Sequence, residues 1–209
     1  MSSIESVSWS RPEDERQGTL LVVALHGRGA DERSMAALVP FMPEGVTLAA
    51  LRGPVRLPGG FTWFENKGVG RPVEASIKET AAAVLSWLRE VEAQHTGVVV
   101  MGFSGGTAMA GGLLFSAAER FSGAVLLSGT LPWDAGFETP QGLLSGMPVF
   151  WSIDPHDPAI PRELWTRSRD WLVEDSGADV QEHVYPGVGH GIAQSEAEDI
   201  TAFLTELSS

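Results

Sequence analysis

The stretch VVVMGFSGG at residues 98–106 decides the fold of this chain, because it joins an apolar run to a serine set between two glycines. Residues 98–101 are all apolar, which is typical of a strand covered on both faces of its sheet. Gly102, Ser104 and Gly106 then form the pattern Gly-x-Ser-x-Gly, and small residues follow. The pattern predicts a sharp strand-to-helix turn that has no room for side chains at the two glycines and holds the serine beside a helix N-terminus.

An incidental serine in a glycine-rich turn is the alternative, since the chain has 24 glycines. The apolar strand before the turn and the helical pattern after it favour a catalytic serine. Such a serine attacks a carbonyl carbon only when a base accepts its proton, and the N-terminal dipole of a helix favours the negative oxygen that results. Ser104 is therefore the candidate nucleophile.

Other apolar runs of strand length lie on both sides of this turn. We expect strands at residues 20–25, 46–51, 97–103, 124–127 and 148–153. We expect helices at residues 74–92, at 164–172 after Pro161, and after a capping box at 195–198. Strands that alternate with helices predict an α/β fold with a mostly parallel sheet and helices on both faces. Neither a repeat nor a linker interrupts the sequence, so we expect residues 1–209 to form a single domain.

Charge and cysteine content exclude several classes of protein. Lys and Arg total 14 against 27 Asp and Glu, a net charge of −13, so we expect no nucleic-acid partner. The absence of cysteine rules out disulfides, zinc–thiolate sites and a cysteine nucleophile. The polar first residues are unlike a signal peptide, and no run approaches the ~20 apolar residues of a membrane span. We therefore expect a cytoplasmic protein without stable membrane anchoring.

A catalytic serine on this fold is followed in the chain by an acid and then by a histidine. The two histidines in a suitable place are His183 and His190. His183 lies in an alternating stretch that is typical of a strand, whereas His190 lies in the flexible turn GVGHG at residues 187–191. That turn can present an imidazole ring at the carboxyl edge of the sheet, so His190 is the candidate base.

The acid has two candidates in the stretch IDPHDP at residues 153–158. Asp154 stands nearer the end of a predicted strand, and Asp157 stands deeper in the loop. Either Asp-Pro pair also suits an ordinary turn. The local sequence leaves both aspartates open.

An oxyanion hole needs the N–H of the residue after the nucleophile, here Gly105, and a second N–H from the loop after an early strand. The stretch LHGRG at residues 25–29 meets that second need. A dinucleotide-binding turn is excluded there, because its third glycine would fall at Glu32. The long connection 52–73 carries three aromatic residues among glycines, and we expect it to lie over the site.

With these segments in place, the chain resembles the phospholipase/carboxylesterase family of α/β-hydrolases, a group without a large lid domain. LHGRG (25–29), GFSGG (102–106), DPAIP (157–161) and GVGH (187–190) are similar, in order, to the family's LHGxG, GFSQG, DPVVP and GxGH. The resemblance implies that Asp157 is the acid, that Arg28 and Gly105 supply the oxyanion N–H groups, and that Trp63 and Phe64 lie beside the acyl pocket. Gly105 replaces the usual glutamine, and the loop at 53–64 is shorter than the family's, so a long-chain acyl preference does not carry over.

We therefore expect a serine hydrolase that cleaves small-molecule carboxylic esters, with thioesters and lysophospholipids as further substrate classes, and that needs no metal or organic cofactor. The candidate substrate contacts are Trp63, Phe64, Trp133 and Trp151; core positions and a homodimer interface are the alternatives for the tryptophans. A non-catalytic binding protein on the same scaffold is the rival outside enzymes. A dienelactone-hydrolase-like enzyme is the rival within them, disfavoured because that group has a cysteine nucleophile.

Overall fold

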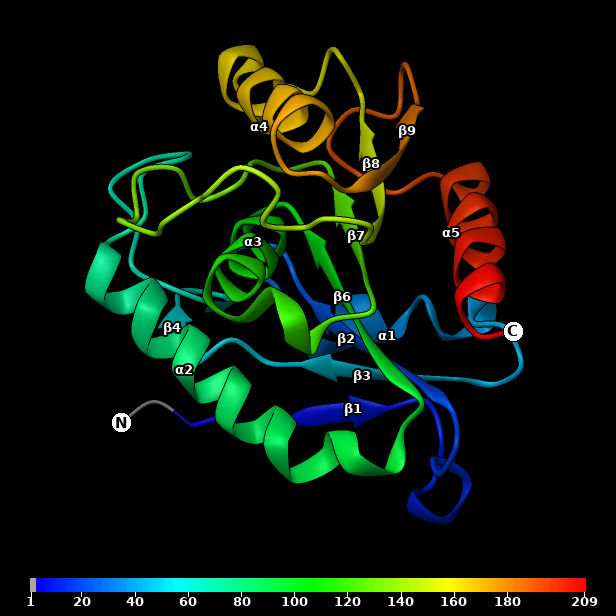
Figure 1. The fold of residues 1–209 in the computed structure, drawn as a ribbon. Coiled ribbons are helices and arrows are strands. Elements are labelled where there is room, and N and C mark those ends of the chain that lie inside the picture. The colour runs from blue at the N-terminus through cyan, green and yellow to red at the C-terminus, as the bar shows by residue number, and fades with distance from the viewer. Residues whose placement is uncertain (1–2) are drawn as a thin grey trace.

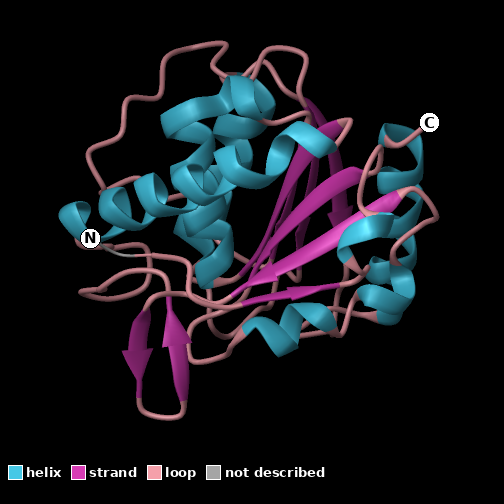
Figure 2. Ribbon diagram, turned by 90° about the horizontal axis from the view of Figure 1, so that it is seen from below, coloured by secondary structure: helices cyan, strands magenta, loops and turns pink. Residues whose placement is uncertain are grey.

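A sheet of seven strands, in the order β1-β3-β2-β6-β7-β8-β9, forms the centre of the computed structural model, which describes residues 3–209 (Figures 1 and 2). The strands are β1 (Val7–Trp9), β2 (Leu20–Leu25), β3 (Val46–Leu51), β6 (Gly97–Phe103), β7 (Gly123–Leu127), β8 (Pro148–Ile153) and β9 (Asp179–Val184). All neighbours pair in parallel except β1 and β3. The five expected strands are confirmed, with β7 beginning one residue earlier than expected.

Helices cover both faces of the sheet, as expected. On one face lie α2 (Glu74–Val91), α3 (Gly105–Ala117) and α4 (Arg162–Glu174), and on the other lie α1 (Glu32–Ala36) and α5 (Gln194–Leu207) (Figures 1 and 2). Strand β2 shows why the apolar runs are continuous: Leu21, Val23 and Leu25 pack into the core on one face. Leu20, Val22 and Ala24, their neighbours in the sequence, pack into the core on the other.

Several elements were not expected from the sequence. The connection 52–73 contains a small hairpin of β4 (Val55–Leu57) and β5 (Gly60–Thr62), and β1 and α1 are also additions. Short 3-10 helices lie at Glu13–Glu15, Val39–Phe41, Glu92–Gln94 and Ala118–Arg120. Elements of three to five residues contain too few side chains to show a periodicity.

The capping box expected at 195–198 is wrong. Helix α5 begins at Gln194, so Ser195 already lies in its first turn and is not the cap residue. Ala193 precedes the helix instead, and its N–H donates to the Glu196 carboxylate at 3.2 Å. A serine in the first turn cannot satisfy the N–H groups that a preceding residue would cap.

Parallel strands place the loops that follow them at one edge of the sheet. The loops after β2, β6 and β8 meet there with the loop after β9, which leads into α5. Ligands of open α/β sheets bind at this carboxyl edge. Within residues 3–209, the structure contains no helix with the length and apolarity needed to cross a membrane.

Candidate active site

Ser104 occupies a sharp turn between β6 and α3. Its backbone has φ 55° and ψ −113°, a strained conformation for a residue with a side chain. A Cβ atom on Gly102 would lie 2.3 Å from the carbonyl oxygen of Gly106, and one on Gly106 would lie 2.0 Å from that of Leu25. Both glycines are therefore required sterically, as the sequence pattern predicts. The Ser104 N–H donates to the Leu127 carbonyl at 3.0 Å, which ties the turn to β7.

Asp157, His190 and Ser104 lie in a line of two hydrogen bonds. Nδ1 of His190 lies 2.7 Å from Oδ2 of Asp157, and Nε2 lies 2.9 Å from Oγ of Ser104. A carboxylate accepts the Nδ1 proton, so Nε2 is left without a proton and can accept that of the serine hydroxyl. The Asp157 side chain is fully buried, whereas that of His190 is 26% exposed. The Asp157 carboxylate is itself held by the N–H of Ala159 at 2.7 Å.

Asp154, the other candidate acid, contacts the backbone of the histidine loop instead of the imidazole. Its Oδ2 atom accepts the N–H groups of Gly187 at 2.9 Å and Gly189 at 2.7 Å, and its Oδ1 atom accepts that of His156 at 2.9 Å. The N–H groups of His156 and Gly189, followed by that of Gly187, lower the pKa of this carboxyl below its ordinary value. The two aspartates therefore have separate contacts: Asp157 bonds the ring of His190, and Asp154 fixes the loop that carries it.

The loop after β2 lies directly against the serine turn. A Cβ atom on Gly105 would lie 3.3 Å from the amide nitrogen of Arg28, so the two candidate oxyanion residues are neighbours. Arg28 and Gly105 also border the same hollow as Ser104. This is the arrangement that two N–H donors directed at one oxygen would need.

His26 and Trp63 hold the start of that loop in place. Nε2 of His26 accepts the N–H of Gly53 at 3.0 Å, so Nδ1 carries the proton and donates to the Gly27 carbonyl at 2.8 Å. The indole N–H of Trp63 donates to the His26 carbonyl at 2.8 Å. Burial of the ring lowers the pKa of His26, which is consistent with a neutral ring that accepts a hydrogen bond.

The β4–β5 hairpin supports the other end of the same loop. Gly29 donates to the Phe61 carbonyl at 2.7 Å, and Phe61 donates to the Ala30 carbonyl at 2.8 Å. A Cβ atom on Gly60 would lie 2.0 Å from the Gly29 carbonyl oxygen. The connection 52–73 thus contacts the site, as expected. Its β4–β5 hairpin supports the loop that carries Arg28.

Two hollows adjoin the Ser104–His190 pair. The first, which we call the small hollow, has a volume of about 130 Å³ and is bordered by Ser104, Gly105, Arg28 and Phe64. The second, which we call the wide hollow, has a volume of about 520 Å³ and is bordered by His190 and by residues of α1 and α5. Phe64, which we expect beside the acyl pocket, lies in the wall of the small hollow; its contact with substrate stays a prediction.

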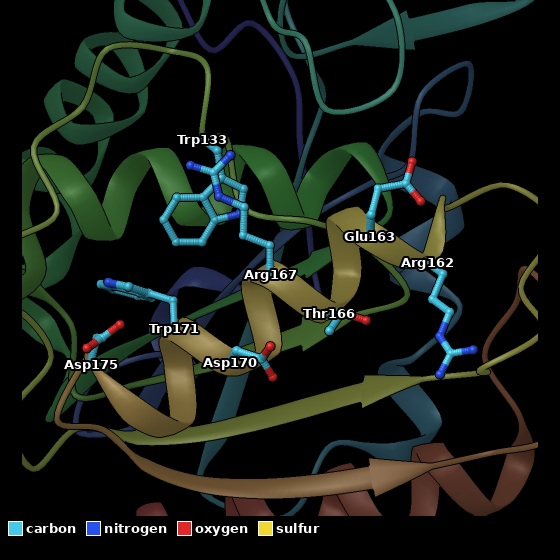
Figure 3. A pocket seen from close by; sticks show the side chains of 8 residues that line it. All are labelled: Trp133, Arg162, Glu163, Thr166, Arg167, Asp170, Trp171 and Asp175. Carbon is cyan, nitrogen blue, oxygen red and sulfur yellow. The ribbon is translucent and has the colours of Figure 1, made fainter.

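The structure places the three candidate tryptophans away from both hollows. Trp63 is 0% exposed and Trp151 is 1% exposed, and both belong to the core. Trp133 lies in a separate, open hollow of about 820 Å³ along α4, where Arg167 lies over its indole ring, as Figure 3 shows. Trp63 and Trp151 thus occupy the core positions that the sequence left open as the alternative. A substrate contact for Trp133 stays a prediction.

His183 is also outside the site. It lies on β9, where its ring stacks on Phe150 at 4.2 Å between centroids. The residues that sequence reasoning did not single out are His26 and Asp154 as anchors of loops, and Val69, Pro72 and Ile160 in the wall of the small hollow. Ile160 lies within DPAIP, so the motif itself was a signal for that wall. Across residues 3–209, no group of three or more carboxylate, imidazole or thiol side chains is placed to hold a metal ion.

Known proteins are similar in sequence to nearly the whole chain. The sequence model of the family described as Phospholipase/Carboxylesterase matches residues 10–208. The putative hydrolase MhqD of Bacillus subtilis is 27% identical, over 89% of this chain and 92% of that protein. Acyl-protein thioesterase 1 of Gibberella zeae is also 27% identical, over 90% of each chain.

Solved structures with the same fold include a carboxylesterase and an acyl-protein thioesterase. The carboxylesterase of Bacillus cereus superposes with a TM-score of 0.80 at 23% identity, over 96% of this chain and 93% of that one. Acyl-protein thioesterase 2 of Zea mays superposes with a TM-score of 0.78 at 23% identity, over 98% of this chain and 99% of that one. At this level of identity, the superpositions bear on the fold alone.

Proposed function

The chain belongs to the phospholipase/carboxylesterase family, and we propose that it is a serine hydrolase that cleaves carboxylic esters through a covalent acyl-enzyme. The observation that carries the proposal is the line of hydrogen bonds from Asp157 through His190 to Ser104, at 2.7 and 2.9 Å. Such a line activates a hydroxyl that is otherwise a weak nucleophile.

In the proposed reaction, Ser104 Oγ attacks the carbonyl carbon of the ester while Nε2 of His190 accepts its proton. The oxygen that becomes negative is stabilised by the backbone N–H groups of Arg28 and Gly105. His190 then gives the proton to the departing alcohol, which leaves an ester between Ser104 and the acyl group. A water molecule gives a proton to His190 and attacks this ester. The bond between the acyl carbon and Oγ then breaks, His190 returns the proton to Oγ, and the carboxylic acid leaves. Asp157 holds the imidazole in the required tautomer throughout.

Thioesters are a second substrate class for the same machinery, because the leaving thiol occupies the place of the alcohol. The similarity to proteins named acyl-protein thioesterase favours including them. We propose a small-molecule substrate for the site and no nucleic-acid partner, in line with the net charge of −13.

The test compares wild type with Ser104→Ala on p-nitrophenyl acetate and on an acetyl thioester. We expect kcat to fall by about four to six powers of ten in the variant, with unchanged circular dichroism. Ser116→Ala is the matched control, because the Ser116 hydroxyl donates within its own helix to Gly112, and we expect it to retain activity. Covalent labelling by a fluorophosphonate should modify wild type and Ser116→Ala and spare Ser104→Ala. Equal turnover by wild type and Ser104→Ala would refute the proposal.

A further inference from the structure

The small hollow and the wide hollow beside the Ser104–His190 pair share no lining residue. The small hollow touches the nucleophile and the two candidate oxyanion residues, and it does not touch His190. The wide hollow touches His190 and does not touch Ser104. Each hollow therefore adjoins a different part of the catalytic group.

We propose that the small hollow holds the acyl part of the substrate and the wide hollow holds the alcohol or thiol part. The preferred substrate is then an ester or thioester of a short acid with a larger, uncharged, apolar alcohol or thiol. This inference rests on the proposed function and adds the substrate class.

The chemistry of the reaction assigns the two hollows. The acyl carbon forms its new bond to Ser104 Oγ, and its oxygen points to the N–H groups of Arg28 and Gly105, so the acyl chain extends from the residues that border the small hollow. The bond to the leaving oxygen or sulfur breaks as that atom takes the proton from Nε2 of His190. The leaving group therefore extends on the side of His190, where the wide hollow lies.

The volume of the small hollow limits the acyl chain. An engineered protein cavity of about 150 Å³ accommodates benzene, a group of six carbon atoms. The small hollow is about 130 Å³, so it covers about six carbons of an acyl chain, and the carbons of a longer chain extend into solvent without gaining contacts. Its apolar walls comprise Phe64, Val69, Pro72, Ala108 and Ile160, which suits a hydrocarbon chain.

The walls of the small hollow are fixed by contacts with α4. Gly70 lies so close to this helix that a Cβ atom on it would be 2.6 Å from Cδ1 of Leu164. Thr130, which also borders the hollow, lies 3.0 Å from the Ser168 hydroxyl in oxygen–oxygen distance. At these two places, the wall can widen for a long chain only if it separates from α4.

The wide hollow is four times larger, and its walls carry no Asp, Glu, Lys or Arg. Apolar side chains border it on several sides: Met35, Leu38, Phe41, Phe103 and Ile192. Burial of a methylene group is worth a factor of about four in binding. A leaving group of several carbons consequently gains affinity there, whereas a charged one finds no side chain of opposite formal charge in the wall.

The test varies the two halves of the ester independently. With p-nitrophenol as the constant leaving group, we expect kcat/KM to be highest at acetate to hexanoate and at least tenfold lower at octanoate. With acetate as the constant acyl group, we expect kcat/KM for hexyl acetate to exceed that for ethyl acetate by about tenfold or more, measured by acid release.

Two substitutions separate the hollows. Ile160→Ala enlarges the small hollow and should shift the acyl profile towards octanoate while keeping the hexyl-to-ethyl ratio. Phe41→Ser removes an apolar wall of the wide hollow and should reduce the hexyl-to-ethyl ratio severalfold while keeping the acyl profile.

The outcomes distinguish the inference from the proposed function. A Ser104-dependent activity that is highest with octanoate or longer esters, or that is indifferent to the size of the alcohol, overturns the inference and leaves the serine hydrolase in place. The inference is also overturned if both Ile160→Ala and Phe41→Ser change the acyl-length profile, or if both change the hexyl-to-ethyl ratio. Absence of Ser104-dependent hydrolysis of every ester tested refutes both.

Discussion

Trp63 and Trp151 are both buried, but of these two indole N–H groups only that of Trp63 donates a hydrogen bond within the described part of the chain. Replacing each tryptophan with phenylalanine measures what that hydrogen bond contributes to stability. The Trp63 indole N–H donates to the His26 carbonyl at 2.8 Å. The Trp151 indole N–H is equally buried and has no acceptor among residues 3–209. Phenylalanine retains an aromatic ring at either position and removes the donor at both.

The expected destabilisation follows from these contacts. At either position, the smaller ring costs about 1 kcal/mol through the volume it leaves empty. In Trp63→Phe, the buried His26 carbonyl also loses its donor, which costs a further ~1–3 kcal/mol. In Trp151→Phe, no acceptor is left unsatisfied, and removal of an unpaired donor offsets part of the cost of the smaller ring. We expect free energies of unfolding lower by about 2–4 kcal/mol for Trp63→Phe and by about 1 kcal/mol or less for Trp151→Phe.

Activity should distinguish the two variants as well. The His26 carbonyl begins the loop that carries Arg28, so its displacement moves a proposed oxyanion donor. Complete loss of such a donor costs 10²–10³ in kcat, and a displaced one should cost less, about tenfold. Trp151→Phe should keep kcat within about twofold, since Trp151 lies in the core and borders neither hollow.

Urea unfolding and p-nitrophenyl acetate turnover of the two variants test both expectations. Thermal unfolding gives a second measure of stability: for a chain of this length, 1 kcal/mol corresponds to a change of about 2–4 °C in Tm. Trp63→Phe should therefore melt at least about 4 °C below wild type. Equal stability and equal kcat in the two variants would show that the Trp63 hydrogen bond does not position the loop.

Two further predictions concern the anchor of the histidine loop and the buried imidazoles. Asp154→Asn replaces one of two accepting oxygens by a donating N–H₂ group, so the side chain can no longer accept both from His156 and from Gly187 and Gly189. We expect kcat to fall about 10–100-fold through misplacement of His190, with little change in KM. Asp170→Asn, on α4, is the control, and a kcat of Asp154→Asn equal to that of wild type would contradict the anchoring role. Burial lowers the pKa values of His26 and His95 from 6.5. Below about pH 6.5, the unfolded chain therefore binds protons at these two histidines more readily than the folded chain, and the free energy of unfolding falls as the pH falls. Above that pH, these two groups add no pH dependence to the free energy of unfolding. Urea unfolding between about pH 5.5 and 8.5 should show this slope and show it reduced in His95→Asn; the same slope in both proteins would argue against a lowered pKa for His95.

Much of the fold follows from the sequence because β-strands buried on both faces need continuous apolar residues. Strand β2 carries six of them, Leu20–Leu25, and alternate side chains enter the two cores. The short elements, such as the β4–β5 hairpin, exist because they pair with the loop at 29–30. Tertiary contacts stabilise these elements, so a local sequence pattern does not predict them.

Local sequence also determines the turn at Ser104. The turn is a matter of sterics between residues a few positions apart: a side chain on Gly102 would meet the backbone of Gly106. The pattern Gly-x-Ser-x-Gly after an apolar strand records that requirement directly. The loop position of His190, between flexible glycines, belongs to the same kind of local information.

The local residues left open which aspartate contacts the imidazole, and only the family resemblance favoured Asp157; the tertiary structure shows this contact, and it shows which aromatic residue borders the small hollow. Asp154 and Asp157 are three residues apart in similar Asp-Pro pairs, yet their partners lie more than 30 positions away, on the loop after β9. Trp63 and Phe64 are adjacent, and one bonds the loop at His26 while the other borders the small hollow. A sequence states which groups are available, but the direction of each side chain depends on the packing of segments that are distant in the chain, and that direction separates an anchor from a candidate catalytic group.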